Sequence, residues 1–311
     1  MKNKDYTHLR IVYMGTPEFA VAPLAHLLEN GCQVVGVVTS PDRPAGRGYH
    51  LQPSPVKKYA EQHQILVLQP EKLRDEAFLA TLQALAADVF VVVAFRMLPA
   101  LVFEMPPLGT FNLHASLLPK YRGAAPINWA VINGETETGL TTFFIEKEID
   151  TGKIILQESV PIGKDTTAGE LHDTLMQKGA DLVLQTVKAI ATGNVQVRVQ
   201  DLQGDYPKAP KIFREDCRID FFREAEQVYN FIRGLSPYPG AFTEFQDKAL
   251  KIFKAKYTLE SHRILPGKWV TDYKTHLSFA CEDGFIHCQE VQAENKKRMS
   301  VVDFLNGISP D

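Results

Sequence analysis

The sequence has few cysteines, and their spacing does not suit a metal site. Only four of its 311 residues are cysteine, and the close pair Cys281 and Cys288 is separated by six residues. Structural zinc sites usually place two cysteines about two to four residues apart. His287 beside Cys288 could touch a metal, but buried or surface thiols are the simpler interpretation. We therefore predict no metal and a reducing, cytoplasmic environment.

Long apolar runs are also missing. No stretch approaches the roughly 18 consecutive apolar residues that a membrane span requires. The first ten residues, MKNKDYTHLR, are polar and lack the apolar core of a signal peptide. We therefore expect a chain without a membrane partner.

Neither sign of charge dominates the chain. The formal net charge at pH 7 is −3, and residues 190–311 hold 17 Lys and Arg against 17 Asp and Glu. The small acidic excess therefore lies in the first part of the chain. Because bulk charge does not indicate a nucleic-acid partner, such a partner would have to be recognised by local basic patches.

The glycine-rich loops of the common nucleotide-binding motifs are absent as well. Residues 15–20, after the first predicted strand, contain a single glycine, Gly15. A dinucleotide-binding turn usually needs three glycines, because the backbone must approach the pyrophosphate closely. The sequence contains no P-loop and no GxSxG motif. Nucleotide hydrolysis and serine-esterase chemistry are therefore not expected.

Apolar segments rich in β-branched residues are present, and they alternate with helical patterns through the first 190 residues. Residues 11–14, 34–39 and 89–94 are expected to form strands, and the last of these, VFVVVA, is apolar on both faces. A helix is expected over residues 17–30. This alternation predicts a doubly wound α/β domain with a mainly parallel sheet.

The pattern changes in the last third of the chain. One amphipathic helix is expected over residues 224–233, and short strand-like segments separated by turns follow it. This spacing predicts a small antiparallel β-barrel of the OB-like kind. We therefore divide the chain into a catalytic domain (1–190), a linker (191–209) and a C-terminal barrel (210–311). The predicted strands of the barrel are residues 241–245, 250–256, 268–271, 276–281 and 285–291.

Two polar residues follow one another at the end of a further predicted strand, residues 111–114. Asn112 and His114 are two positions apart, so their side chains point to the same face of the strand. An amide and an imidazole at one point can stabilise an oxygen that gains negative charge. The alternative is that both side chains only close a loop.

An acidic residue, Asp150, lies in a predicted turn over residues 148–152. The flanking segments 140–144 and 154–158 resemble strands. Asp150 could simply bond its own backbone, as many turn residues do. It could also face His114 and fix the orientation of the imidazole ring.

The combination of these motifs resembles the folate-dependent formyltransferases. The pattern Asn-x-His-x-Ser-Leu-Leu-Pro runs from Asn112 to Pro119, and Asp-Thr-Gly follows from Asp150 to Gly152. The resemblance covers nearly the whole chain and is most specific for the branch of the family that acts on methionyl-tRNA. Further similar segments are residues 14–20, 41–48, 53–57, 121–127, 218–221 and 236–240.

This resemblance implies a Rossmann-like catalytic domain and a formyl transfer. The donor would be 10-formyltetrahydrofolate, and the acceptor would be the α-amino group of methionine on initiator tRNA. Asn112 and His114 would stabilise the oxygen of the transferred group, and Asp150 would orient His114 and help to move protons. The segment implied for folate binding is Ser116, Leu117, Leu118 and Pro119.

The resemblance also implies contacts with tRNA by residues 40–52, a segment rich in arginine, glycine and proline. Arginines on such a backbone suit phosphate contacts, although the segment could be only a surface loop. Lysines of the linker and the barrel could likewise bind RNA or form solvated faces. The residues that we assign to tRNA are Arg43, Arg47, Lys208, Lys211, Lys248 and Lys251.

We expect the protein to be a monomer.

One position departs from the family pattern. After the strand at residues 89–94 the family usually has an aromatic residue and then glycine, whereas this chain has Phe95 and Arg96. An arginine at this position could change how the pterin ring is held.

Two other interpretations remain open on the sequence. A formyltransferase acting on glycinamide ribonucleotide or on an amino sugar nucleotide would share the catalytic residues. The formyltransferase that acts on glycinamide ribonucleotide lacks a domain like residues 210–311 and lacks the arginine-rich loop. An RNA-binding protein with an inactive catalytic domain is the second interpretation, and the complete set of Asn112, His114 and Asp150 argues against it.

Overall fold

The computed structural model describes residues 5–45 and 50–308, and the chain divides into two compact units. Each unit combines segments that are far apart in the sequence. Unit 1 consists of Met1–Gly123, Thr138–Val160 and His172–Pro207, and unit 2 consists of Ala124–Glu137, Pro161–Leu171 and Lys208–Asp311.

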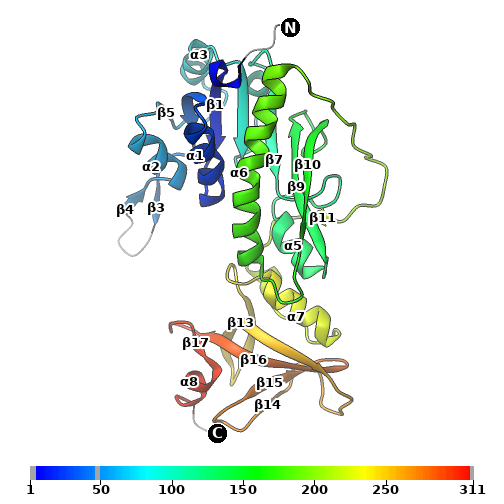
Figure 1. The fold of residues 1–311 in the computed structure, drawn as a ribbon. Helices are drawn as coiled ribbons and strands as arrows, with labels where there is room; N and C mark the ends of the chain where they lie inside the picture. Colours follow the sequence, from blue (N-terminus) through cyan, green and yellow to red (C-terminus); the bar gives the residue numbers. More distant parts are fainter. Residues whose placement is uncertain (1–4, 46–49, 309–311) are drawn as a thin grey trace. The chain divides into compact units, whose positions relative to one another are not determined.

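A seven-stranded sheet forms the centre of unit 1, in the order β10-β9-β7-β6-β1-β2-β5 (Figure 1). β1 pairs in parallel with β2 and β6, β2 with β5, and β6 with β7, whereas β7 and β9 are antiparallel. The predicted mainly parallel, doubly wound sheet is confirmed. The strands are β1 (Arg10–Gly15), β2 (Gln33–Val38), β5 (Val67–Leu68), β6 (Val89–Val93), β7 (Thr110–His114), β9 (Glu137–Phe144) and β10 (Ile154–Pro161).

Helical layers cover both faces of this sheet. Met14 of β1 belongs to an apolar core that includes Phe78 of α3. On the other face α6 runs along the strands (Figure 1), and its Gly179 lies against Leu113 of β7. Burial on both faces explains why β6 is apolar at every position. The helices are η1 (Tyr6–His8), η2 (Glu18–Ala20), α1 (Val21–Glu29), α2 (Pro55–Gln62), α3 (Glu76–Ala84), α4 (Ala100–Phe103) and α6 (Ala168–Thr192).

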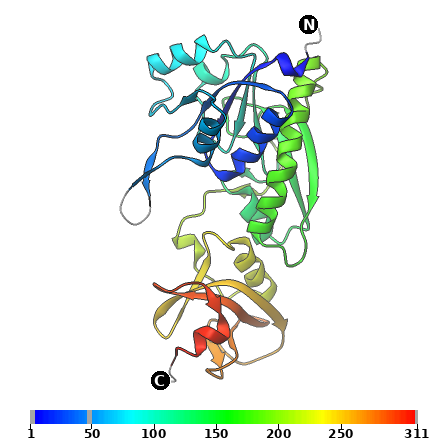
Figure 2. The same ribbon diagram turned by 60° about the vertical axis from the view of Figure 1, so that its left-hand side comes forward.

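A short hairpin lies outside the sheet and beside α2 (Figures 1 and 2). It consists of β3 (Arg43–Ala45) and β4 (His50–Gln52), which pair antiparallel with Arg43 opposite Gln52. We call residues 40–52 the arm. Residues 46–49 of the arm lie outside the described residues.

Unit 2 contains a second sheet, in the order β12-β13-β16-β15-β14, with β17 paired to β16. Its pairings are antiparallel, and its curvature is visible in Figure 2. Among the described residues β12 and β14 do not pair, so the sheet is a curled half-barrel, and the antiparallel barrel-like tail is confirmed. Its strands are β12 (Ala241–Phe245), β13 (Lys248–Leu259), β14 (Trp269–Thr271), β15 (Leu277–Ala280), β16 (Gly284–Ala293) and β17 (Met299–Ser300).

Large apolar residues such as Phe279 and Ile286 fill the core of this half-barrel. No helix in the described ranges is both long enough and apolar enough to cross a membrane. The remaining short elements of the chain are β8 (Arg122–Gly123), α5 (Pro126–Ile132), β11 (Lys208–Ala209), η3 (Glu215–Cys217), α7 (Ala225–Gly234) and α8 (Val301–Leu305).

Candidate active site

Asn112 and His114 lie at the carboxyl end of β7, on one face of the sheet. The register places Asn112 beside Val92 of β6 and His114 beside Thr141 of β9. Leu113, between them, points into the opposite layer toward α6. His114 is buried, whereas Asn112 is partly exposed. The two-residue period of the strand therefore brings an amide and an imidazole to the edge where open parallel sheets bind ligands.

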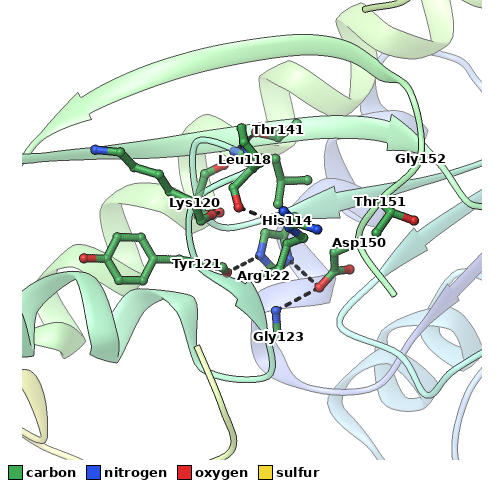
Figure 3. Close-up of polar contacts among 12 residues, drawn as sticks. His114, Leu118, Lys120, Tyr121, Arg122, Gly123, Thr141, Asp150, Thr151 and Gly152 are labelled. Atoms are coloured by element: carbon green, nitrogen blue, oxygen red, sulfur yellow. Dashed lines mark hydrogen bonds and ion pairs between the residues drawn. The ribbon is translucent and has the colours of Figure 1, made fainter. Parts of the chain in front are cut away.

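A backbone carbonyl holds the imidazole ring of His114 (Figure 3). Nε2 of His114 lies 2.9 Å from the carbonyl oxygen of Tyr121. Because a carbonyl oxygen can only accept a hydrogen bond, Nε2 carries a proton, and Nδ1 is the ring atom left for proton exchange. Nδ1 faces Oδ2 of Asp150 at a distance of 3.9 Å. This distance exceeds a direct hydrogen bond, so a third atom is needed to pass a proton between the two groups.

Asp150 adopts an uncommon backbone conformation that distant residues stabilise. Its φ of 56° lies in the left-handed region, which few residues other than glycine occupy. Oδ2 of Asp150 accepts the N–H of Gly123 at 3.0 Å. The amide of Gln200 donates to the backbone carbonyls of Asp150 at 3.0 Å and of Gly152 at 2.8 Å. Gln200 is itself buried, so Asp150 is held by Gly123 through its carboxylate and by Gln200 through its backbone.

Gly152 allows the turn to approach β9 closely. A Cβ atom at this position would lie 1.7 Å from the carbonyl oxygen of Phe144, the last residue of β9. Since that contact involves backbone, no side chain can be accommodated there. The absence of a side chain at Gly152 therefore determines where Asp150 lies relative to β9.

The segment predicted to bind folate follows β7 directly. The hydroxyl of Ser116 donates to a backbone carbonyl within the loop at 2.7 Å. The hydroxyl of Thr141 donates to the carbonyl of Ser116 at 2.6 Å and accepts the N–H of Leu118 at 3.1 Å. Ser116 and Leu118 are buried, whereas Leu117 and Pro119 are partly exposed. Ser116 and Leu118 therefore hold the loop in shape, and the side chains of Leu117 and Pro119 are the ones accessible to a ligand.

The residues predicted for tRNA contact lie in both units. Arg43 is exposed on β3, and Arg47 lies outside the described residues. Lys208 at the start of β11 and Lys248 at the start of β13 are both exposed. Each of these described cations can therefore reach a phosphate without a large desolvation cost.

Two further lysines predicted for tRNA contact have partners within unit 2. The ammonium of Lys211 lies 5.1 Å from the centre of the Phe213 ring. Nζ of Lys251 donates to the carbonyl oxygen of Pro239 at 2.8 Å. Lys251 is therefore partly committed to the turn before β12, whereas Lys211 remains exposed above an aromatic ring.

Arg96 is committed to backbone contacts. Nη1 donates to the carbonyl of Glu71 at 2.9 Å, and Nη2 donates to the carbonyl of Pro70. Nε is buried and has no hydrogen-bond partner in the part of the chain that the structure describes. Burial, together with the positive charge of Arg43, lowers the pKa of Arg96. The guanidinium group of Arg96 is therefore bound to two backbone carbonyls rather than free.

Sequence reasoning missed several groups that build the site. The carbonyl of Tyr121 and the N–H of Gly123 are backbone groups, which no residue pattern identifies. Gln200 lies in the segment predicted as a linker, and no local signal marked it. Thr141 was visible only as one residue of a strand-like segment, although it is fully buried and bonded to the loop after β7.

The thiols of this chain are poorly reactive at neutral pH. All four cysteines are free and buried. Burial raises the pKa of Cys32 to about 11 and that of Cys281 to about 12. Thiols of such high pKa are poor nucleophiles at neutral pH. Among the described residues there is also no group of three or more His, Cys, Asp or Glu that could hold a metal ion.

Comparison with known families identifies both parts of the chain. Residues 9–187 match the family described as Formyl transferase. Residues 211–309 match the family described as Formyl transferase, C-terminal domain. The first match alone covers more than half of the chain.

Similar proteins extend over the full length. The methionyl-tRNA formyltransferase of Phocaeicola vulgatus is 55% identical over 317 aligned residues, which cover 99% of this chain and 97% of the relative. That of Bacteroides fragilis is 52% identical over 315 aligned residues, which cover 99% of this chain and 96% of the relative. The solved structure of WlaRD, a sugar 3N-formyl transferase in the presence of dTDP and 5-N-formyl-THF, has a TM-score of 0.66 at 21% identity. That comparison covers 93% of this chain and 99% of WlaRD, and it concerns the fold.

Proposed function

The chain belongs to the formyl transferase family, and we propose that it transfers the formyl group of 10-formyltetrahydrofolate to the α-amino group of methionyl-tRNA. The observation that carries this assignment is the similarity across both matched regions. Relatives that are 52% and 55% identical over nearly their whole length are methionyl-tRNA formyltransferases. The product is N-formylmethionyl-tRNA, which serves translation initiation.

The reaction exchanges one carbon–nitrogen bond for another. The amine of methionine attacks the formyl carbon, the bond from this carbon to the folate nitrogen breaks, and a proton passes from the amine to that nitrogen. The donor supplies the activated formyl group. The remaining requirements are a place for the charged oxygen and a path for the proton.

We assign these two requirements to Asn112, His114 and Asp150. Within the described residues the Asn112 amide makes no hydrogen bond, so it can donate to the oxygen that gains charge. Nε2 of His114 is engaged by Tyr121, so Nδ1 is the atom that takes up a proton and then donates. Asp150 lies 3.9 Å from Nδ1, on the side where the attacking amine would share its proton.

The loop after β7 suits the donor in our proposal. Leu117 and Pro119 offer partly exposed apolar surface in the loop that follows the strand of Asn112, and Ser116 and Leu118 maintain the loop. An apolar wall next to a few convergent polar groups is the usual character of a small-molecule site. We therefore retain residues 116–119 as the folate-contacting segment.

We also retain the division into a catalytic domain (1–190), a linker (191–209) and a tRNA-binding half-barrel (210–311). The proposed tRNA contacts are those of the arm and of the basic residues already described. We propose that the protein works as a monomer in the cytoplasm. Size-exclusion chromatography with light scattering tests the oligomeric state.

Formylation in vitro tests the proposed function. The purified protein is incubated with 10-formyltetrahydrofolate and methionine-charged initiator tRNA, and formylmethionine is released and quantified. We expect formylmethionine to accumulate in proportion to enzyme. Uncharged tRNA and free methionine serve as controls and should not support the reaction.

Two results would contradict the assignment in different ways. Transfer to a small amine, such as an amino sugar nucleotide, without transfer to methionyl-tRNA would assign the protein to another branch of the family. Binding of tRNA without any formyl transfer would instead indicate an RNA-binding protein with an inactive site.

A further inference from the structure

Arg96 links two segments of unit 1 that are distant in sequence. It follows β6 by three residues, close to the edge of the sheet that carries Asn112. Its two terminal nitrogens donate to the consecutive carbonyls of Pro70 and Glu71, which follow β5. A planar guanidinium can satisfy two neighbouring acceptors at once, which a lysine ammonium does less well. Arg96 therefore bridges the ends of β6 and β5.

The segment that Arg96 holds also anchors the arm. Nε2 of Gln69 donates to the carbonyl of Ser40 at 2.9 Å and to Oδ1 of Asp42 at 2.7 Å. Oδ2 of Asp42 accepts from Nζ of Lys57 at 2.6 Å. Because Gln69 directly precedes Pro70, the hydrogen bonds of Arg96 and those of Gln69 are joined by one peptide bond, and together they connect Arg96 to the first residues of the arm.

The contacts of Asp42 stabilise its charged form. The hydrogen bond from Lys57 and then that from Gln69 lower the pKa of Asp42. The base of the arm is therefore tied by charge-assisted hydrogen bonds at neutral pH. Arg43, the next residue, is exposed, and its positive charge helps to lower the pKa of Arg96. The chain of contacts thus ends beside the cation that we assign to tRNA.

We propose that Arg96 is a positioning residue for methionyl-tRNA. By holding Pro70 and Glu71 it keeps Gln69 in place, and Gln69 in turn fixes the base of the arm and hence the position of Arg43. This inference rests on the proposed function, because it takes methionyl-tRNA as the acceptor. It also assigns Arg96 to the acceptor side of the reaction rather than to the pterin ring of the donor.

Steady-state kinetics of Arg96→Ala test this role. We expect the KM for methionyl-tRNA to rise roughly tenfold, the size of effect expected for a residue that acts through others. The kcat and the KM for 10-formyltetrahydrofolate should change less than about twofold. Arg74→Ala is the matched control, since Arg74 is an exposed arginine three residues after Glu71. A rise in the KM for the donor, with an unchanged KM for tRNA, would place Arg96 at the pterin instead and overturn the proposal.

Arg96→Lys separates charge from geometry. A lysine at this position keeps the positive charge but cannot bridge two carbonyls in the same way. We expect its KM for methionyl-tRNA to stay raised, between those of the wild type and of Arg96→Ala. Wild-type kinetics in Arg96→Lys would mean that charge alone matters, and the bridging role would be wrong.

Hydrogen–deuterium exchange provides a readout that does not depend on activity. In Arg96→Ala the backbone amides of the non-proline residues within 40–45 and 69–71 should exchange faster, while those of β1 and β6 stay protected. Gln69→Ala should accelerate exchange at 40–45 alone, and the double variant should add little there because both residues act in series. Unchanged exchange at 40–45 in Arg96→Ala would refute the link to the arm. If the wild type fails to formylate methionyl-tRNA, the proposed function is wrong, but the exchange result still decides whether Arg96 holds the arm.

Discussion

At the scale of single residues, the imidazole of His114 has two polar neighbours with different requirements. Tyr121 presents a carbonyl that only accepts, which assigns a proton to Nε2. Asp150 presents a carboxylate across 3.9 Å, too far for a direct hydrogen bond to Nδ1. The hydrogen bond to the Tyr121 carbonyl therefore orients the ring, and in our proposal the carboxylate of Asp150 acts on the bound amine.

Asp150→Asn should abolish most of the turnover without disturbing the turn. Asparagine tolerates the φ of 56° and keeps an oxygen that can accept the N–H of Gly123. Only the negative charge is lost, so we expect kcat to fall by about a hundredfold or more. The measurement is single-turnover formylation at saturating substrates.

Glu148→Gln is the control for this prediction, because Glu148 is exposed in the same turn. Its turnover should equal that of the wild type. Near-normal turnover in Asp150→Asn would remove the charge of Asp150 from the mechanism.

His287, in unit 2, should make stability depend on pH. Burial, and then the charge of His276, lowers the pKa of His287 below its usual 6.5, although Glu260 opposes this. The neutral ring is satisfied by the hydroxyls of Thr258 and Ser278, each at 2.8 Å. Below about pH 6.5 the unfolded chain therefore binds a proton that the folded chain resists, and the free energy of unfolding falls.

Urea unfolding of the wild type and of His287→Gln between about pH 8 and pH 5 measures this contribution. The wild type should lose more stability than the variant as the pH falls through the usual histidine range. His8→Gln, at an exposed histidine, should follow the wild type. Parallel curves for His287→Gln and the wild type would show that His287 does not contribute.

At the scale of elements, the site depends on the close approach of two chain segments. The turn with Asp150 reaches β9 only because Gly152 has no side chain. The loop after β7 reaches β9 through Thr141, whose hydroxyl both donates and accepts. β9 is thus the common support of the loop that we assign to folate and of the carboxylate that we assign to catalysis.

Gly152→Ala should destabilise unit 1 and inactivate the enzyme. The added Cβ would lie 1.7 Å from the carbonyl oxygen of Phe144, and backbone must move to relieve the overlap. Overpacking of this kind costs about 1–3 kcal/mol or more, and here it displaces Asp150 as well. Thermal unfolding and formylation rate should both decline.

Gly307→Ala is a useful comparison, since its Cβ would meet nothing closer than 3.6 Å. Its melting temperature should change little. A Gly152→Ala protein with wild-type stability and turnover would mean that the turn can shift without moving Asp150.

At the scale of the whole molecule, charge is nearly balanced, so recognition of RNA depends on where individual cations lie. Residues 190–311 are neutral in sum, yet Lys208 and Lys248 are both exposed. A neutral domain can still bind phosphates through such local contacts, and each contact releases counterions. Binding should therefore weaken as salt rises.

Replacing Lys208 and Lys248 together by Gln should reduce the salt dependence of tRNA binding. On the scale known for duplex DNA, the slope of log K against log salt should become shallower by about 0.9 for each phosphate that is no longer neutralised by a lysine. Filter binding over a series of KCl concentrations measures this slope. Lys178→Gln is the control, because Lys178 already pairs with Glu158 at 2.6 Å. An unchanged slope in the double variant would mean that these lysines only form a solvated face.

The sequence by itself determined the fold class and predicted the location of the site. The order and spacing of apolar segments predicted a mainly parallel sheet and a separate antiparallel tail. A strand buried on both faces is apolar along its whole length, whereas a strand buried on one face alternates between apolar and polar residues. The two-residue spacing of Asn112 and His114 predicted a shared face, since strand side chains alternate. The resemblance of the surrounding motifs to a family supplied the chemistry, which spacing alone left open.

Only the tertiary structure decided how the site is held together. The proton on Nε2 of His114 depends on a backbone carbonyl, and backbone groups carry no residue identity that a sequence pattern could reveal. Gln200 reaches Asp150 across 50 positions, and Arg96 reaches Pro70 across 26. Such contacts depend on how the strands pair and on where the loops lie in the folded chain. Local periodicity reports on near neighbours in the chain, so the partners of Asp150 and Arg96 appear only once the chain is folded.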